Sequence, residues 1–336
     1  MAWRSTAYRA ARPLLFRLGP EAVHHAALGG VQLAGGLPAL GRLASGAPRA
    51  SAADAIELAG LRFRNRIGLA AGFDKDGVAI EGWAALGFGF VELGTVTPRP
   101  QAGNPRPRLH RLPEDDALIN RMGFNNAGAA ALAARISRAR RDLPPGFVIG
   151  VNVGRNRDGG DEDFGAAAGA VARGADYLAI NVSSPNTAGL RDLQAADALA
   201  RLIGAVREAG PGRPVLVKLA PDLDADARST LVRGVVAAGG AGVIVSNTST
   251  ERADLRSERA SEAGGLSGAP LRDRARRAVA EARAAAGDGI VVIGSGGVAS
   301  AGDARALLDA GADLVQLWTG MIYAGPGLIG EAVAAC

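Results

Sequence analysis

The sequence predicts an α/β protein built on a closed (β/α)8 TIM barrel, with a two-helix extension at its N-terminus. Eight short apolar runs recur from residue 67 onward, and segments with helical periodicity separate them. Continuous apolar runs of this length are typical of parallel strands that are buried on both faces. Polar residues and glycines follow every run, as at the rim where the strands of a barrel end. An open, doubly wound sheet is the alternative.

The first 50 residues form a unit of their own, called here the N-terminal segment. Ala7–Leu18 and Glu21–Leu33 have the pattern of two short helices divided by Gly19-Pro20, and residues 35–50 are predicted as a linker rich in Gly, Pro and Ala. The two helices present many apolar side chains with little else to pack on. We expect them either to dock on the barrel or to offer an apolar, basic face to a membrane.

Residues 51–336 form the barrel unit. The pair Ile56–Leu58 and Leu61–Phe63 predicts a small hairpin that closes the barrel floor. Between the later strands, Ala195–Ala209, Asp224–Ala238 and Leu271–Ala286 have helical periodicity. The eight barrel strands are predicted at Ile67–Ala71, Phe90–Val96, Phe147–Val153, Tyr177–Val182, Val215–Leu219, Gly242–Val245, Ile290–Ile293 and Leu314–Leu317.

The net charge of +5 belongs to the N-terminal segment, which holds six arginines and a single acid, Glu21. The rest of the chain is therefore close to neutral. A nucleic-acid surface needs basic residues clustered on the fold, usually with aromatic residues between them for single strands. That pattern is missing from the barrel sequence, so a nucleic-acid partner is not expected.

Several classes of site are disfavoured by composition. The chain has one cysteine, Cys336, so neither a disulfide framework nor a thiolate metal site is expected. Asp74, Asp76 and Asp222 are scattered over different predicted loops, which argues against a metal site. No apolar run is long enough to span a bilayer. The arginine-rich N-terminus also lacks the apolar region of a secretory signal.

Lysine usage points to the rim. The 38 basic residues include only two lysines, Lys75 and Lys218, and both follow or end predicted strands. A lysine is a slim point charge, and an arginine fork does not fit every site that takes it. Asn152, Asn181, Asn186 and Asn247 belong to the same set of strand ends. Amides and cations gathered in this way predict a site for an anionic small molecule.

The stretch GSGGVAS at 294–300 leaves a strand and enters a helix, which predicts a phosphate cradle of backbone amides. No histidine is obviously placed to activate Ser183 or Ser184 as a nucleophile. The rim therefore suits a planar, phosphate-bearing cofactor that supplies the reactive chemistry itself.

The stretch NRMGFNNAG at 120–128 begins the second barrel helix after a long, polar loop. Asn125 or Asn126 is interpreted as the N-cap of that helix. Asn120 is expected to contact a ligand, because its loop is long enough to fold over the rim.

A series of motifs occurs in order over about residues 13–330: AAGFDKDG, GTVTPRPQAGNPRPR, INRMGFNN, NVSSPNTAGLR, VKLAPD, SNT, GGLSG and GSGGV. Taken together they closely resemble the class 2, quinone-dependent dihydroorotate dehydrogenases. The resemblance implies an oxidoreductase with an FMN-containing barrel, one FMN per chain, and an N-terminal helical pair. Such an enzyme oxidises (S)-dihydroorotate to orotate in de novo pyrimidine (UMP) biosynthesis and passes the electrons to a membrane quinone, either ubiquinone or menaquinone.

The resemblance also assigns site residues. Ser184 would be the catalytic base, and His24 and Arg111 would line a quinone tunnel. The substrate would meet Lys75, Asn120, Arg121, Met122, Gly123, Phe124, Asn181, Asn186, Asn247 and Thr248. The flavin would lie against Ala71, Gly72, Phe73, Asp74, Lys75, Thr95, Asn152, Asn181, Lys218, Ser246, Gly268, Gly297, Trp318 and Thr319.

In this interpretation the stretch NVSSPNT at 181–187 places amides on both sides of a catalytic hydroxyl. Ser184 would take the proton from C5 as hydride leaves C6. Class 1 relatives use a cysteine as the base, and the absence of a cysteine near the rim favours class 2. The N-terminal segment would attach a monomer peripherally to the cytoplasmic face of the inner membrane in a bacterial host.

Three positions depart from the family pattern. Ser246 stands where threonine is common, and Arg155 stands where lysine is frequent. Trp318 stands where tyrosine is expected, so a quinone hydrogen bond from a tyrosyl hydroxyl is not expected there.

Two other classes of function remain open at the level of the residues. The first is a flavin-free barrel lyase or isomerase that forms a Schiff base at Lys75 or Lys218. The second is a non-catalytic, membrane-associated ligand binder, against which the density of polar residues at the rim argues.

Overall fold

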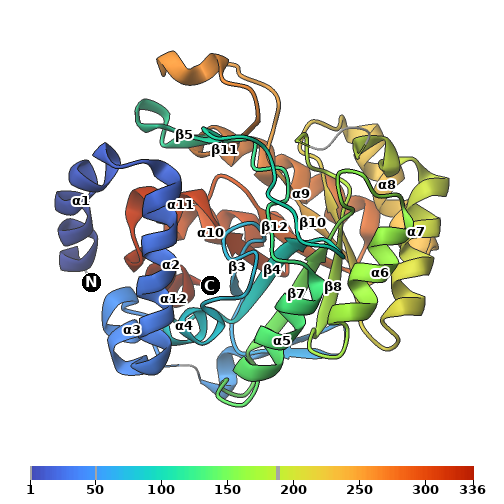
Figure 1. Cartoon of the computed structure of the whole chain (residues 1–336), viewed down its shortest axis with the longest axis horizontal. Coiled ribbons are helices and arrows are strands. Elements are labelled where there is room, and N and C mark those ends of the chain that lie inside the picture. Colours follow the sequence, from blue (N-terminus) through green and yellow to red (C-terminus); the bar gives the residue numbers. More distant parts are fainter. Residues whose placement is uncertain (1, 50, 187–189) are drawn as a thin grey trace.

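Eight parallel strands form a closed barrel at the centre of the molecule (Figure 1). The computed structural model describes residues 2–49, 51–186 and 190–336. Strand β13 pairs with β3, with Val315 opposite Ile67, and this pairing closes the barrel. The predicted barrel is confirmed. Its strands, in the order in which they pair, are β3 (Ile67–Leu69), β4 (Phe90–Val96), β7 (Val148–Val153), β8 (Tyr177–Asn181), β9 (Val215–Leu219), β10 (Gly242–Val245), β12 (Val291–Ser295) and β13 (Leu314–Leu317).

The barrel floor is filled by large side chains and covered by the predicted hairpin. Strands β1 (Ile56–Leu58) and β2 (Leu61–Phe63) pair antiparallel. The ring of Phe63 meets that of Phe90 edge-on, with ring centroids 5.5 Å apart. Gly150 leaves room for Tyr177, because a Cβ at that position would overlap the tyrosine ring. This dense packing leaves the carboxyl ends of the strands as the open end of the barrel.

Helices cover the outside of the barrel and bury one apolar face each. In α5 (Ala129–Ala139) that face comprises Ala129, Leu132, Ile136 and Ala139, which recur at helical spacing. The other helices of this layer are α4 (Ile80–Ala85), α6 (Glu162–Val171), α7 (Ala196–Ala209), α8 (Ala225–Ala237), α9 (Arg272–Ala286), α10 (Ala301–Asp309), α11 (Thr319–Ala324) and α12 (Gly327–Ala335).

A second, three-stranded antiparallel sheet lies beside the carboxyl ends of the barrel strands, and β5 and β11 stand at the top of the view in Figure 1. This rim sheet consists of β5 (Leu109–Leu112), β6 (Ala117–Asn120) and β11 (Gly265–Gly268). The sequence predicted only a long loop after β4. Pairing with β11, for example Ile119 opposite Leu266, gives the loop its strands, and that partner is remote in sequence.

The predicted N-cap role of Asn125 or Asn126 is wrong. Helix α5 has Gly128 at its N-cap, with φ +89°, a conformation that favours glycine. Asn126 instead joins the loop to β4: its Oδ1 accepts from the Gly128 amide at 2.8 Å, and its Nδ2 donates to the Thr97 hydroxyl at 2.8 Å.

The N-terminal segment contains three helices, α1 (Ala2–Arg17), α2 (Pro20–Gly36) and α3 (Pro38–Ser45). The two predicted helices are confirmed, but the predicted linker is wrong over residues 38–45. Pro38 begins α3, and Gly46 ends it with φ +72°. Proline at a helix start and glycine just past its end delimit helices, although the same composition suggests a loop. Helix α3 packs on α4, where Gly41 contacts Ala85 closely.

All three helices dock along one side of the barrel (Figure 1). Tyr8 on α1 donates its hydroxyl to the Ile322 carbonyl of α11 at 2.7 Å. Glu21 on α2 accepts from Arg108 at 2.6 Å and from Arg106 at 3.0 Å. Docking on the barrel, one of the two expected roles, is therefore observed. None of the helices within residues 2–49, 51–186 and 190–336 is long and apolar enough to cross a membrane.

Candidate active site

A cavity opens at the carboxyl ends of the barrel strands and extends under the rim sheet; it is called here the polar cavity, because lysine and asparagine side chains are part of its lining. Most residues that the sequence assigned to the cofactor or the substrate line this one cavity, although they come from many different loops. They are Ala71, Gly72, Lys75, Thr95, Asn120, Met122, Gly123, Phe124, Asn181, Ser184, Asn186, Lys218, Ser246, Asn247, Thr248, Gly268, Gly297, Trp318 and Thr319.

Four assigned residues do not line the polar cavity. Asp74 is buried and serves its own loop, accepting from the Val78 and Ala79 amides and from the Trp83 indole. Arg121 donates to Glu262 and the Pro107 carbonyl, within the rim loops. The other two are Phe73, which lines a neighbouring apolar cavity, and Asn152, which lies behind the lining.

Several residues that line the cavity were not predicted from the sequence. Ser295 and Gly296 belong to the GSGGVAS stretch, and Gly320 follows Thr319, so their neighbours pointed to them. Gln316 lies within the apolar run of β13 and also lines the cavity. A lone polar residue inside a buried strand was the pattern that could have revealed it.

A buried carboxylate, Glu92 on β4, organises the centre of the barrel below the cavity. It accepts from Asn152 Nδ2 at 2.8 Å, from Gln316 Nε2 at 2.7 Å and from the Tyr177 hydroxyl at 3.1 Å. These bonds orient both amides. Gln316 Oε1 is left buried without a hydrogen-bond partner. A buried acceptor of this kind calls for a donor from a ligand.

Lys218 supplies a positive charge to the same cavity. Burial lowers the pKa of its ammonium, and the nearby charge of Glu92 opposes that shift. The cation therefore has a counter-charge in the barrel interior while it lines the cavity. A cation held in this way stabilises negative charge on a bound planar group.

A network of amides and hydroxyls surrounds Ser184. Asn181 Nδ2 donates to the Thr95 hydroxyl at 2.8 Å, and its Oδ1 accepts from the Ser183 hydroxyl at 3.2 Å. Asn247 Nδ2 donates to Ser183 Oγ at 2.8 Å. The Ser183 hydroxyl is thus engaged within the network and does not line the cavity, whereas Ser184 does. Ser184 Oγ accepts from the backbone N–H of Asn186 at 3.3 Å.

Lys75 lines the cavity from the loop after β3. Its Nζ donates to the Gly72 carbonyl at 2.9 Å. Burial lowers the pKa of Lys75 to about 8; the charge of Asp76 opposes this shift, and the charge of Arg108 adds to it. The ammonium is therefore charged at neutral pH but titrates far below an ordinary lysine.

Glycines shape the end of the cavity after β12. Gly296 and Gly297 have φ +120° and +72°, and a Cβ on Gly297 would overlap the backbone of Arg272. A Cβ on Gly320 would likewise overlap the Val298 carbonyl. Backbone amides can approach a phosphate closely at such positions.

An apolar cavity adjoins the polar one and lies between the N-terminal segment and the barrel. His24, Leu109 and Trp318 line both cavities. The His24 ring lies 4.9 Å from that of Phe73 and parallel to Trp318 at 6.5 Å. Burial, with a further effect from Lys75, lowers the pKa of His24 to about 3, so the imidazole is neutral. Arg111, the second predicted tunnel residue, also lines this cavity.

A family model described as dihydroorotate dehydrogenase matches residues 54–333. The chain belongs to the dihydroorotate dehydrogenase family. Among curated relatives, the dihydroorotate dehydrogenase (quinone) of Anaeromyxobacter dehalogenans strain 2CP-C is 48% identical over 333 residues, covering 96% of this chain and 90% of the relative. The protein of that name from Novosphingobium aromaticivorans is 46% identical and covers 98% of this chain and 94% of the relative.

Solved structures agree with this family assignment. A dihydroorotate dehydrogenase from Eimeria tenella, in complex with ferulenol, superposes with a TM-score of 0.86 at 36% identity, covering 94% of this chain and 90% of that chain. Dihydroorotate dehydrogenases are flavoenzymes. The unpaired Gln316 acceptor, the Lys218 cation and the glycine-lined end of the polar cavity fit a flavin that carries a phosphate.

Proposed function

We propose that this protein oxidises (S)-dihydroorotate to orotate, with one FMN per chain, and passes the electrons to a membrane quinone in de novo pyrimidine biosynthesis. The observation that carries the proposal is the meeting of the two cavities at His24 and Trp318. A polar cavity suits a charged substrate, and an apolar cavity suits a quinone. Their contact lets one cofactor serve both.

The residues that would hold FMN surround the polar cavity. Gly296, Gly297 and Gly320 would admit the phosphate, and Lys218 would face the ring system. Thr95, Ser246 and Thr319 add hydroxyl groups to the same lining. When bound, FMN supplies the acceptor for the hydride. The protein contributes binding, orientation and charge.

The substrate would lie under the rim sheet. Lys75 would pair with its carboxylate, while the amides of Asn120, Asn186 and Asn247 would orient the ring. Ser184 Oγ would accept the proton from C5 and pass its own hydroxyl proton to water as the hydride leaves C6, and the C5–C6 bond becomes a double bond.

The N-terminal segment supports membrane attachment. Six exposed large apolar residues lie in this segment: Leu14, Leu18, Leu33, Leu37, Leu40 and Leu43. The segment also carries the net positive charge, which attracts anionic lipid headgroups. The protein would be a monomer bound peripherally to the cytoplasmic face of a bacterial inner membrane. The apolar cavity would open toward that membrane as the quinone route.

An acceptor-dye assay tests the proposed reaction. Purified protein should be yellow, and with dihydroorotate it should reduce the dye in the absence of quinone and reduce an added quinone as well. Equal amounts of heat-inactivated protein serve as the blank. A colourless protein that cannot take up FMN would instead favour a flavin-free lyase or isomerase with a Schiff base at Lys75 or Lys218. A flavoprotein that turns over another substrate but not dihydroorotate would also contradict the proposal.

Orotate binding should weaken as the pH rises through about 8. The depressed pKa of Lys75 means that its ammonium is charged below this pH and loses its proton above it, and only the charged form pairs with the carboxylate. Titrating orotate against the flavin absorbance on both sides of this pH measures the effect. Lys75→Met should bind more weakly at every pH and lack the change near 8. An affinity of the unchanged protein that is constant across this range would exclude the assigned role of Lys75.

A further inference from the structure

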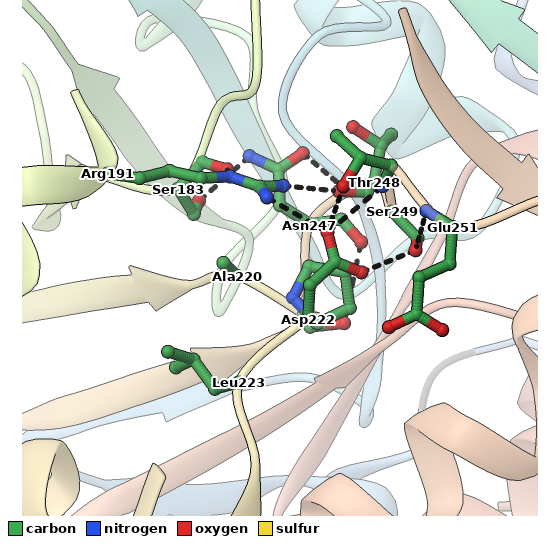
Figure 2. Close-up of polar contacts among 12 residues, drawn as sticks. Ser183, Arg191, Ala220, Asp222, Leu223, Asn247, Thr248, Ser249 and Glu251 are labelled. Carbon is green, nitrogen blue, oxygen red and sulfur yellow. Dashed lines mark hydrogen bonds and ion pairs between the residues drawn. The ribbon is translucent and has the colours of Figure 1, made fainter. Parts of the chain in front are cut away.

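One guanidinium joins three of the loops that follow barrel strands. Arg191 Nε donates to the Ser183 carbonyl at 3.2 Å, and Nη2 donates to the Thr248 carbonyl at 3.1 Å. Its Nη1 donates to Asp222 Oδ2 at 2.9 Å. Figure 2 shows the Arg191 side chain reaching past Ser183 toward Thr248, with Asp222 close by. The loops after β8, β9 and β10 are therefore held to the same side chain.

The two carbonyls that accept from Arg191 belong to loop segments that line the polar cavity. The Ser183 carbonyl belongs to the peptide that leads into Ser184. The Thr248 carbonyl ends the pair Asn247–Thr248, which lines the polar cavity with Ser184. Arg191 itself does not line that cavity, so it acts on the backbone behind the lining.

Asp222 keeps the guanidinium in place. Besides Arg191, it accepts from the Thr250 amide at 2.9 Å, from Arg274 at 3.0 Å and from the Ser249 hydroxyl. Burial alone would raise the pKa of Asp222, but the hydrogen bonds from Ser249, Thr250 and Arg191 outweigh it and lower the pKa. The carboxylate is therefore an ionised anchor at neutral pH.

We propose that Arg191 is a positioning residue, whose guanidinium, anchored on Asp222, sets the placement of the Ser184 loop relative to the Asn247–Thr248 loop. The inference rests on the proposed function, because it assigns the Ser184 hydroxyl to proton transfer. A proton acceptor must lie within hydrogen-bond reach of the C–H it deprotonates, so the spacing of the two loops governs the rate.

Arginine is required for this role because of its shape. A planar guanidinium donates in several fixed directions at once and thereby reaches two carbonyls and a carboxylate. A lysine at this position keeps the charge and the Asp222 pair but loses the fork. A misplacement of about 1 Å in a catalytic group costs about 10²-fold in rate.

The test compares Arg191→Lys with a matched arginine elsewhere. Arg283 also holds carbonyls, those of Gly311 and Ile290, together with Asp313, but it lies at the end of the barrel where β12 and β13 begin. Stopped-flow reduction of the bound flavin by dihydroorotate, orotate affinity from the flavin spectrum, FMN content and Tm are measured for Arg191→Lys, Arg283→Lys and the unchanged protein.

We expect the limiting rate of flavin reduction to fall about 10²-fold in Arg191→Lys, with a much smaller change in orotate affinity and full FMN content. Arg283→Lys should keep the rate of the unchanged protein. Asp222→Asn should lower the rate in the same direction, and combining it with Arg191→Lys should add little, since the two act as a unit.

Three results would overturn the inference. The first is a limiting rate of flavin reduction in Arg191→Lys that equals the rate in Arg283→Lys. The second is a loss of rate in Arg191→Lys and Arg283→Lys that is matched in each variant by a loss of bound FMN. The third applies if Arg191→Lys fails to fold while the other variants fold: an unchanged limiting rate in Asp222→Asn would then overturn the inference. A yellow, unchanged protein that dihydroorotate does not reduce would overturn the proposed function instead.

Discussion

Replacing Ser184 with alanine should slow flavin reduction by dihydroorotate about 10²–10⁴-fold, the range for a lost general base. Ser184 lines the polar cavity. Its Oγ accepts a hydrogen bond from the backbone N–H of Asn186, and this bond does not use the hydroxyl proton of Ser184. FMN content and orotate affinity should stay close to those of the unchanged protein, because many other groups contact both ligands. Stopped-flow absorbance of the flavin is the measurement.

Ser183→Ala is the matched control for this prediction. Its hydroxyl bonds to Asn181 and Asn247 and is buried away from the cavity lining. We therefore expect a modest loss of rate through loosened amides. Ser184→Cys should keep part of the activity with a different pH profile. An unchanged rate in Ser184→Ala would move the base to Ser183 or to water.

Replacing Leu14, Leu33 and Leu37 together with glutamate should abolish most liposome binding. These side chains are 64%, 75% and 60% exposed, so the folded protein loses little by the change. Full burial of one leucine contributes about 1.5–3 kcal/mol, and losing three should weaken binding to anionic liposomes at least about 10²-fold. Reduction of quinone held in the liposomes should fall in parallel, while dye reduction in solution stays unchanged.

Val236→Glu provides the control for this triple variant. Val236 lies on α8, outside the N-terminal segment, and is also a large apolar residue with an exposed side chain. Liposome binding equal to that of Val236→Glu would contradict attachment through the leucines. Point substitutions are sharper here than deletion of residues 1–50, because Tyr8, Glu21 and Leu28 pack on the barrel, and deletion would expose their contacts.

The sequence alone determined the barrel and most of the cavity lining. Parallel strands that are buried on both faces must be apolar throughout, so the eight runs are visible without an alignment, and each observed strand overlaps its predicted run. The loops that follow these strands share one rim of the barrel, where the active sites of such barrels are built, and polar residues therefore gather in them. Lys75 and Lys218 were found in this way, whereas Ser184 was assigned by the resemblance of its motif to the family.

Tertiary structure decided what depends on partners distant in sequence. The rim sheet exists because β6 pairs with β11, and no local pattern reveals that pairing. The role of Glu92 is visible only in the structure, where it accepts hydrogen bonds from Asn152, Tyr177 and Gln316, which come from three other strands. From the sequence alone, Arg191 cannot be told from a surface arginine. In the folded protein it donates hydrogen bonds to Ser183, Asp222 and Thr248. The sequence shows which positions are polar and which are apolar. Hydrogen bonds, however, form between residues that are close in space, and these residues become close only when the barrel closes.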